Sequence, residues 1–252
     1  MSRRAALILT SALVLAGCDQ AVGARMIFND TETTKVTDIV LTGGNGDVRV
    51  RTGTEATTKV QRVVTGGTSP GSSYTLKDGV LSLTTDCGSD CRVSYEIEAP
   101  AGVTVRGEMR SGDVFLTQVG PVDLKLTSGD VAVEDATSDV AVRSTSGDIS
   151  VTGGGAASLE TTNGDIVALG TTGPMTARST SGDIALNLAS ASSVTATVAN
   201  GDIEVFVPRG DYRISAQSAH GEATVMDLAD DPKAANTLNL RASNGDITVT
   251  GR

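Results

Sequence analysis

Residues 122–151 read VDLKLTSGDVAVEDATSDVAVRSTSGDISV and contain two copies of the motif on which the fold depends. The motif is Ser or Asn, then Gly, Asp, and Val or Ile. From Asp113 onward its acidic position recurs at steps of 17, 18, 17, 18, 19, 20 and 24 residues, with Glu222 in one degenerate copy. A short, nearly fixed period is the sequence signature of a repeat architecture. The Gly-Asp pairs are Gly46 and Asp47, Gly112 and Asp113, Gly129 and Asp130, Gly147 and Asp148, Gly164 and Asp165, Gly182 and Asp183, Gly201 and Asp202, and Gly245 and Asp246.

Apolar residues alternate with polar ones on both sides of each motif. Val131 and Val133 stand one and three positions after Asp130, and Val122 and Leu124 stand eight and six positions before it. Alternation with a period of two, rich in β-branched residues, is typical of short strands with one buried face. Each repeat therefore supplies two strands. The same columns are expected to face inward in every copy, including Ile214, Ala216, Ala223 and Val225 in the degenerate one.

Two such strands cannot bury an apolar face alone, whereas stacked repeats share a continuous core. We therefore predict an all-β fold, a β-solenoid resembling a parallel β-helix, with coils of about 17–19 residues that each rise by one strand spacing of ~4.8 Å. The alternative is an antiparallel meander in which each Ser-Gly or Asn-Gly is a hairpin turn.

The solenoid also predicts a ladder of side chains at the position five before the aspartate. Opposite charges occupy several successive positions of this ladder, and such pairs would help to hold register, although chance occupancy of a solvent face gives the same pattern. The expected order is Glu108, Lys125, Arg143, Glu160, Arg178, Thr197, Gln217 and Arg241.

The repeat is interrupted between Asp47 and Asp113, which are 66 residues apart. We expect the intervening hairpin section to sheath the N-terminal end of the solenoid. The predicted organisation is a signal peptide at 1–17, an anchor and linker at 18–35, a first coil plus the hairpin section at 36–110, and the repeat solenoid at 111–252. The last coil is expected to end the stack with an open edge, guarded against pairing by Arg241 and Arg252.

The first 18 residues indicate export and lipid attachment. Arg3 and Arg4 precede an apolar run at 5–16 that is too short to cross a bilayer, and the run is followed by Gly17 and Cys18. The Leu-Ala-Gly-Cys sequence at 15–18 resembles the lipobox of bacterial lipoproteins. This resemblance implies that Cys18 carries the lipid and that the protein is anchored to a membrane on its periplasmic or cell-surface side. An ordinary cleaved signal peptide is the alternative.

The other two cysteines are separated by three residues. In an oxidising compartment we expect Cys87 and Cys91 to form a disulfide that closes a small loop, at about 2 kcal/mol by the loop-closure relation. A redox-active pair or half of a zinc site is the alternative.

The amino-acid composition argues against two classes of function. The chain has a net charge of −10, one His and no Trp, so nucleic acid is not expected as a partner and a multi-His metal site is excluded. The column of motif aspartates is expected to shape turns and to bind no cofactor, with calcium as the alternative. A second acidic group, Asp227, Asp230 and Asp231, is expected to be a solvated loop.

From about residue 36 to 252 the chain resembles the bacterial "putative adhesin" family of β-strand-repeat domains of unknown function. The resemblance rests on four features: a first coil at 39–50, the hairpin sequence KDGVLSL at 77–83, the strand ending APAGV at 99–103, and the repeat array. It implies a β-helical fold, an envelope or surface location and no established enzymatic activity. These motifs shape turns and core, so no binding residue is implied.

We therefore predict a non-catalytic, lipid-anchored envelope protein whose solenoid is an adhesin-like scaffold for an envelope glycan or protein. One alternative is a polysaccharide-active β-helix enzyme, but most coils leave only about 5–7 residues for a variable turn, too few to wall a cleft. A catalytic triad would need His220, which occupies a turn position. The other alternative is a self-assembling structural protein of the envelope.

Overall fold

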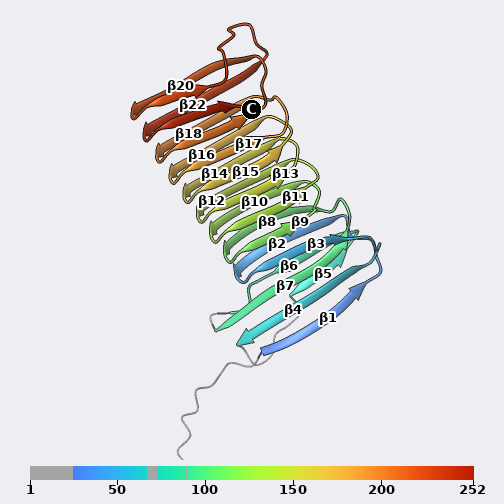
Figure 1. Ribbon diagram of the computed structural model, residues 1–252. Coiled ribbons are helices and arrows are strands. Elements are labelled where there is room, and N and C mark those ends of the chain that lie inside the picture. The colour runs from blue at the N-terminus through green and yellow to red at the C-terminus, as the bar shows by residue number, and fades with distance from the viewer. Residues whose placement is uncertain (1–24, 67–72, 89) are drawn as a thin grey trace, which may run out of the picture.

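The computed structural model describes residues 25–66, 73–88 and 90–252, which fold into two long sheets that face each other along the molecule (Figure 1). In spatial order, sheet A contains β1 (Arg25–Glu32), β4 (Thr58–Gly66), β7 (Cys91–Pro100), β3 (Val48–Gly53), β9 (Val114–Thr117), β11 (Val131–Ala136), β13 (Ile149–Gly153), β15 (Ile166–Thr171), β17 (Ile184–Leu188), β19 (Ile203–Val207), β23 (Ile247–Gly251) and β21 (Ala223–Met226). Sheet B contains β20 (Tyr212–His220), β22 (Asn236–Asn244), β18 (Val194–Asn200), β16 (Met175–Ser181), β14 (Ala157–Asn163), β12 (Val140–Ser146), β10 (Val122–Ser128), β8 (Thr104–Ser111), β2 (Asp38–Asn45), β6 (Val80–Thr84) and β5 (Tyr74–Lys77). The described part of the chain has no helix that is long and apolar enough to cross a membrane.

Each coil is one strand of sheet B followed by one strand of sheet A. Equivalent strands of successive coils pair in parallel, as β10 does with β12, where Val122 is the partner of Val140 and Lys125 is the partner of Arg143. The prediction of a β-solenoid is therefore confirmed. The meander is excluded for the repeat array because consecutive strands there lie in different sheets instead of pairing.

The core is a continuous apolar layer between the sheets. In the coil of β10 and β11, Val122, Leu124, Val131 and Val133 each expose 3 % or less of their surface. Full burial of one such side chain stabilises the fold by about 1.5–3 kcal/mol. Because each coil adds four or more of these side chains, burial between stacked coils holds the solenoid together.

The predicted charge ladder lies on the outer face of sheet B. The Nζ atom of Lys125 is 3.3 Å from Oε1 of Glu108, and Nε of Arg143 is 3.4 Å from Oε2 of Glu160. All four side chains are exposed, so each pair contributes only about 0.2–1 kcal/mol. The order differs from the prediction at the far end, because Arg241 lies between Thr197 and Gln217.

The last coil along the chain is not the last coil of the stack. β22 and β23 insert between the coil of β18 and β19 and the coil of β20 and β21 (Figure 1). The expectation that Arg241 and Arg252 guard the terminal edge is therefore wrong. Arg241 is interior to sheet B, and the backbone N–H of Arg252 donates to the carbonyl of Val207 on β19.

The coil of β20 and β21 forms this end of the stack instead. Its columns were expected to be buried, yet Ala223 and Val225 are exposed, and Ile214 and Ala216 are half-buried. The physical reason is that no further coil of the described chain covers them.

The 66-residue step from Asp47 to Asp113 does not separate the coils on either side of it. β2 and β3 pair directly with β8 and β9. Part of the predicted hairpin section is a further coil, since β6 pairs in parallel with β2 and β7 pairs in parallel with β3. The section also contributes β4 and β5, which extend the two sheets beyond this coil by antiparallel pairing. Residues 25–32, expected in a linker, form β1 at the edge of sheet A.

Polar side chains join the two sheets at this N-terminal end. The Arg62 guanidinium is buried, and its Nη1 donates to Oγ of Ser73 at 2.7 Å. The hydroxyl of Tyr95 lies 2.6 Å from the Ser73 carbonyl oxygen, and burial raises the pKa of Tyr95. On the two edge strands, the Tyr74 hydroxyl donates to Oε1 of Glu32 at 3.0 Å. The pKa of Tyr74 is raised, mainly by burial and secondly by this hydrogen bond. These contacts link β5 to β1 and close the N-terminal end.

The inserted coil predicts an unequal response to two deletions. Deleting 236–252 removes the only pairing partner of β20 among the described strands, whereas deleting 210–233 removes the terminal coil and leaves the other coils in sequence order. We expect the first deletion to leave residues 208–235 open to protease and the second to stay resistant. Limited proteolysis read by mass spectrometry, with thermal unfolding alongside, checks this. Equal resistance of the two variants would contradict the insertion.

Candidate functional site

The Gly-Asp corner joins each sheet B strand to the following sheet A strand, and its glycines have no room for a side chain. Gly164 has a φ of +144°, and a Cβ built on it would lie 2.2 Å from the carbonyl oxygen of Gly147 in the neighbouring coil. Gly147 and Gly182 also have positive φ, at +129° and +133°, and a Cβ on either would lie 2.1 Å from the neighbouring carbonyl oxygen. The corner therefore requires glycine both for its conformation and for the close contact of stacked backbones.

The motif aspartates form one column along the corners. Oδ1 of Asp148 accepts a hydrogen bond from the backbone N–H of Asp165 at 2.8 Å, and Oδ1 of Asp165 accepts one from Asp183 at 2.8 Å. The sequence predicted that these aspartates shape turns. The structure shows that their hydrogen bonds run between neighbouring coils. The column comprises Asp47, Asp113, Asp130, Asp148, Asp165, Asp183, Asp202 and Asp246, with bonds of 2.7–3.2 Å.

The column extends beyond the aspartates at both ends. Ser94 takes the aspartate's place in the coil of β6 and β7, where its Oγ accepts from the N–H of Asp47 at 3.1 Å. At the other end, Glu222 donates its N–H to Oδ1 of Asp246 at 2.8 Å. Sequence reasoning missed Ser94 because no glycine precedes it. The sequence feature that could have identified Ser94 is the alternation after it, in which Tyr95 and Ile97 are both buried.

The other candidate residues lie apart from one another. Cys87, in the loop after β6, forms a disulfide with Cys91, the first residue of β7. His220 is exposed at a corner, with Nδ1 3.2 Å from the carbonyl oxygen of Ser243. Cys18 and the predicted signal peptide lie outside the described residues.

The acidic loop after β21 uses two of its carboxylates locally. Oδ1 of Asp230 accepts from the N–H of Ile214 at 2.7 Å, and Oδ1 of Asp231 accepts from the N–H of Lys233 at 2.9 Å. Among the residues that the structure describes, no group of three or more His, Cys, Asp or Glu side chains is placed to hold a metal ion.

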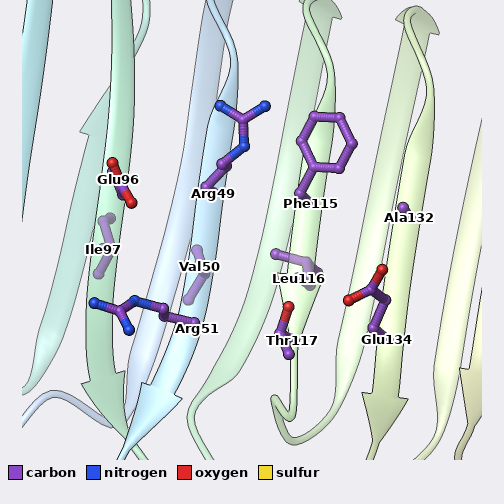
Figure 2. Close-up of a pocket in the computed structure, with 10 residues that line it drawn as sticks. All are labelled: Arg49, Val50, Arg51, Glu96, Ile97, Phe115, Leu116, Thr117, Ala132 and Glu134. Carbon is purple, nitrogen blue, oxygen red and sulfur yellow. The ribbon is translucent and has the colours of Figure 1, made fainter.

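A shallow hollow on the outer face of sheet A gathers aromatic, cationic, anionic and hydroxyl side chains. Its volume is about 260 Å³, and it spans β7, β3, β9 and β11. Two rows of outward residues form what we call the sheet A patch, because strand register places them side by side. Figure 2 shows these residues, which are Glu96, Arg49, Phe115 and Ala132 in one row and Arg51, Thr117 and Glu134 in the other.

The patch combines an aromatic ring with charged groups. The Arg49 guanidinium carbon lies 4.7 Å from the centroid of the Phe115 ring, and the small side chain of Ala132 leaves space beside that ring. Arg51 is held by Glu98, with Nη2 to Oε2 at 2.8 Å. The arrangement offers a half-buried apolar surface with a guanidinium next to it.

Sequence reasoning did not find the patch. Arg49 and Phe115 each stand two positions after a motif aspartate, so they belong to one outward column. An alignment of that column across the copies could have pointed to these two residues. Their contact depends on the direct pairing of β3 with β9 across the 66-residue interruption, which the sequence alone did not show.

The two sheets, the repeated coil and the corner column define a β-solenoid repeat protein. Residues 36–250 match the model of the Toastrack DUF4097 family, so the chain belongs to that family, in agreement with the resemblance seen in the sequence.

Two solved structures share the fold. A putative adhesin from Parabacteroides distasonis is 14 % identical with a TM-score of 0.62, over 90 % of this chain and 97 % of that one. A putative adhesin from Bacteroides fragilis is 17 % identical with a TM-score of 0.52, again over 90 % and 97 %. At these identities the likeness concerns the fold alone. No curated protein matches the chain.

The aspartate column predicts different effects for two substitutions of Asp165. Both substitutions remove repulsion from the neighbouring carboxylates, roughly 0.5–1 kcal/mol each in water at the coil spacing. Asp165→Asn keeps an acceptor oxygen, whereas Asp165→Ala removes the acceptor for the Asp183 N–H, so the unfolding free energy of the Ala variant should be about 1 kcal/mol lower than that of the Asn variant. We therefore expect the Asn variant to be neutral or more stable in urea unfolding. Equal losses in both variants would contradict the hydrogen-bond role.

Proposed function

We propose that the protein is a non-catalytic, lipid-anchored component of the bacterial cell envelope whose solenoid is an interaction scaffold, and that the sheet A patch contacts an envelope glycan. The observation that carries the proposal is the patch itself. It sets Phe115 beside Arg49, Thr117 and Glu134 on strands that are fixed by pairing on both sides.

The chemistry of the patch suits a sugar. The apolar face of a pyranose ring can pack on Phe115, while hydroxyl groups donate to Glu134 and accept from Arg49. The site is shallow, so a single contact would be weak. An anchored protein, however, meets its ligand at high local concentration, and many weak contacts then suffice.

Two further observations support an envelope scaffold. The Leu-Ala-Gly-Cys sequence at 15–18 follows an export-like segment, and solved structures with the same fold are described as putative adhesins. The coil design also favours a non-catalytic role, because most turns between strands are short and the hollow on sheet A is shallow. These supports are independent of one another.

Lipid anchoring at Cys18 predicts a change of location on substitution. In cell fractionation, we expect Cys18→Ser to move the protein from the membrane fraction to the soluble exported fraction, because no acyl chain remains to hold it. The double variant Cys87→Ser, Cys91→Ser is the control and should stay with the membrane. Retention of Cys18→Ser in the membrane fraction would contradict lipid anchoring at Cys18.

Glycan binding by the patch predicts a local effect of substitution. Purified peptidoglycan sacculi and a panel of soluble envelope oligosaccharides are the probes. We expect Phe115→Ala, and Arg49→Ala separately, to lower binding at least about tenfold. Phe206→Ala is the matched control, because Phe206 also faces outward from sheet A beneath an arginine, on the distant strand β19. Binding unchanged in the Phe115 and Arg49 variants would exclude the patch.

A further inference from the structure

The two ends of the solenoid are finished differently. At the N-terminal end, antiparallel strands and the Tyr74–Glu32 hydrogen bond join the edges of the two sheets. At the other end, β20 and β21 are the last strands of sheets B and A, and no described strand lies outside them. An open edge carries unpaired N–H and C=O groups, and it is a template for pairing.

Apolar side chains are exposed at this open end. Val225 is 39 % exposed and Met226 is 43 % exposed, and Ala223 is exposed beside them. Val225 is the strand partner of Val249, which is fully buried in the adjacent coil. The inward column therefore continues to the end of the stack and stops there without cover.

The loop after β21 covers only the start of the β20 edge. The N–H of Asp231 donates to the carbonyl of Tyr212, and Asp230 accepts from the N–H of Ile214. The edge from Ser215 to His220 has no such partner in the described chain. What remains open is a six-residue edge in sheet B, the whole of β21 in sheet A, and the apolar layer between them.

We propose that this end pairs with the same end of a second copy of the chain, so that both sheets and the core continue across a two-fold axis. A single extended peptide could satisfy one edge, but two edges about 10 Å apart with an apolar layer between them fit a partner that has the same two sheets. Antiparallel pairing of 215–220 with itself satisfies the two-fold symmetry, and each covering loop then lies beyond the paired stretch.

The small size of this end indicates a weak contact. The open edges are six residues long in sheet B and four in sheet A. With the two sheets about 10 Å apart, they give an end of roughly 350 Å² per copy, or about 700 Å² in total. This is below the roughly 1,200 Å² at which standard specific interfaces begin, so we expect a weak dimer that forms at roughly tens to hundreds of micromolar. The inference does not depend on glycan binding by the sheet A patch.

Sedimentation velocity from about 1 to 500 µM tests the dimer, using the chain from residue 19 onward without lipid. We expect Val225→Lys to lower the association constant at least tenfold, because it places a charge in the paired end. Leu169→Lys is the matched control: Leu169 is 42 % exposed on sheet A at mid-stack, and its substitution should leave association unchanged.

A second measurement keeps the test independent of folding. Gln217 lies near the proposed two-fold axis, so Gln217→Cys should be joined to its copy by a short bismaleimide, whereas Thr162→Cys, exposed on sheet B at mid-stack, should not. A monomer at every concentration, equal effects of Val225→Lys and Leu169→Lys, or crosslinking at Thr162→Cys alone would each overturn the proposal. In those cases glycan binding could still be measured on the monomer.

Discussion

Backbone hydrogen bonding between coils through the Gly-Asp corner is the constraint on which the rest of the structure depends. Strands of neighbouring coils pair in parallel, and the pairing continues around the turn because corner N–H groups donate to the next coil, as Gly147 does to Asn163. A side chain at the glycine would collide with the backbone below it, and the aspartate supplies an acceptor to the coil above it. Register is thereby set at every coil, so that apolar columns coincide and form one core.

A stack of this kind has two ends, and at each end the spatial order of the coils differs from their order in the sequence. At the N-terminal end the coil of β6 and β7 lies outside that of β2 and β3, and at the other end the coil of β20 and β21 lies outside that of β22 and β23. The consequence is that an interior coil is added after an outer one in the chain. At the N-terminal end the outer coil is further covered by antiparallel strands and a buried Arg62. The opposite end keeps an exposed inward column.

The outward columns are free to vary because they make few contacts that fix the fold. On sheet B they hold exposed ion pairs of small energy, such as Lys125 with Glu108. On sheet A they bring Arg49 against Phe115 in a hollow with carboxylates nearby. A rigid frame with variable outward columns is suited to recognition, and the proposed functions use two separate surfaces of it: one outer face and one end.

The sequence by itself determined the repeated coil, its parallel stacking and which columns face the core, because those properties are local and recur in every copy. It also supported the disulfide between Cys87 and Cys91, because two cysteines this close are expected to pair in the oxidising compartment that the export-like segment predicts. Only the tertiary structure decided the order of the coils at the ends, the role of Ser94 and the contact of Arg49 with Phe115. These depend on which distant segments pair. Parallel edges of similar length and pattern can accept several partners, so pairing is settled by the total burial of the folded stack and not by any short stretch of residues.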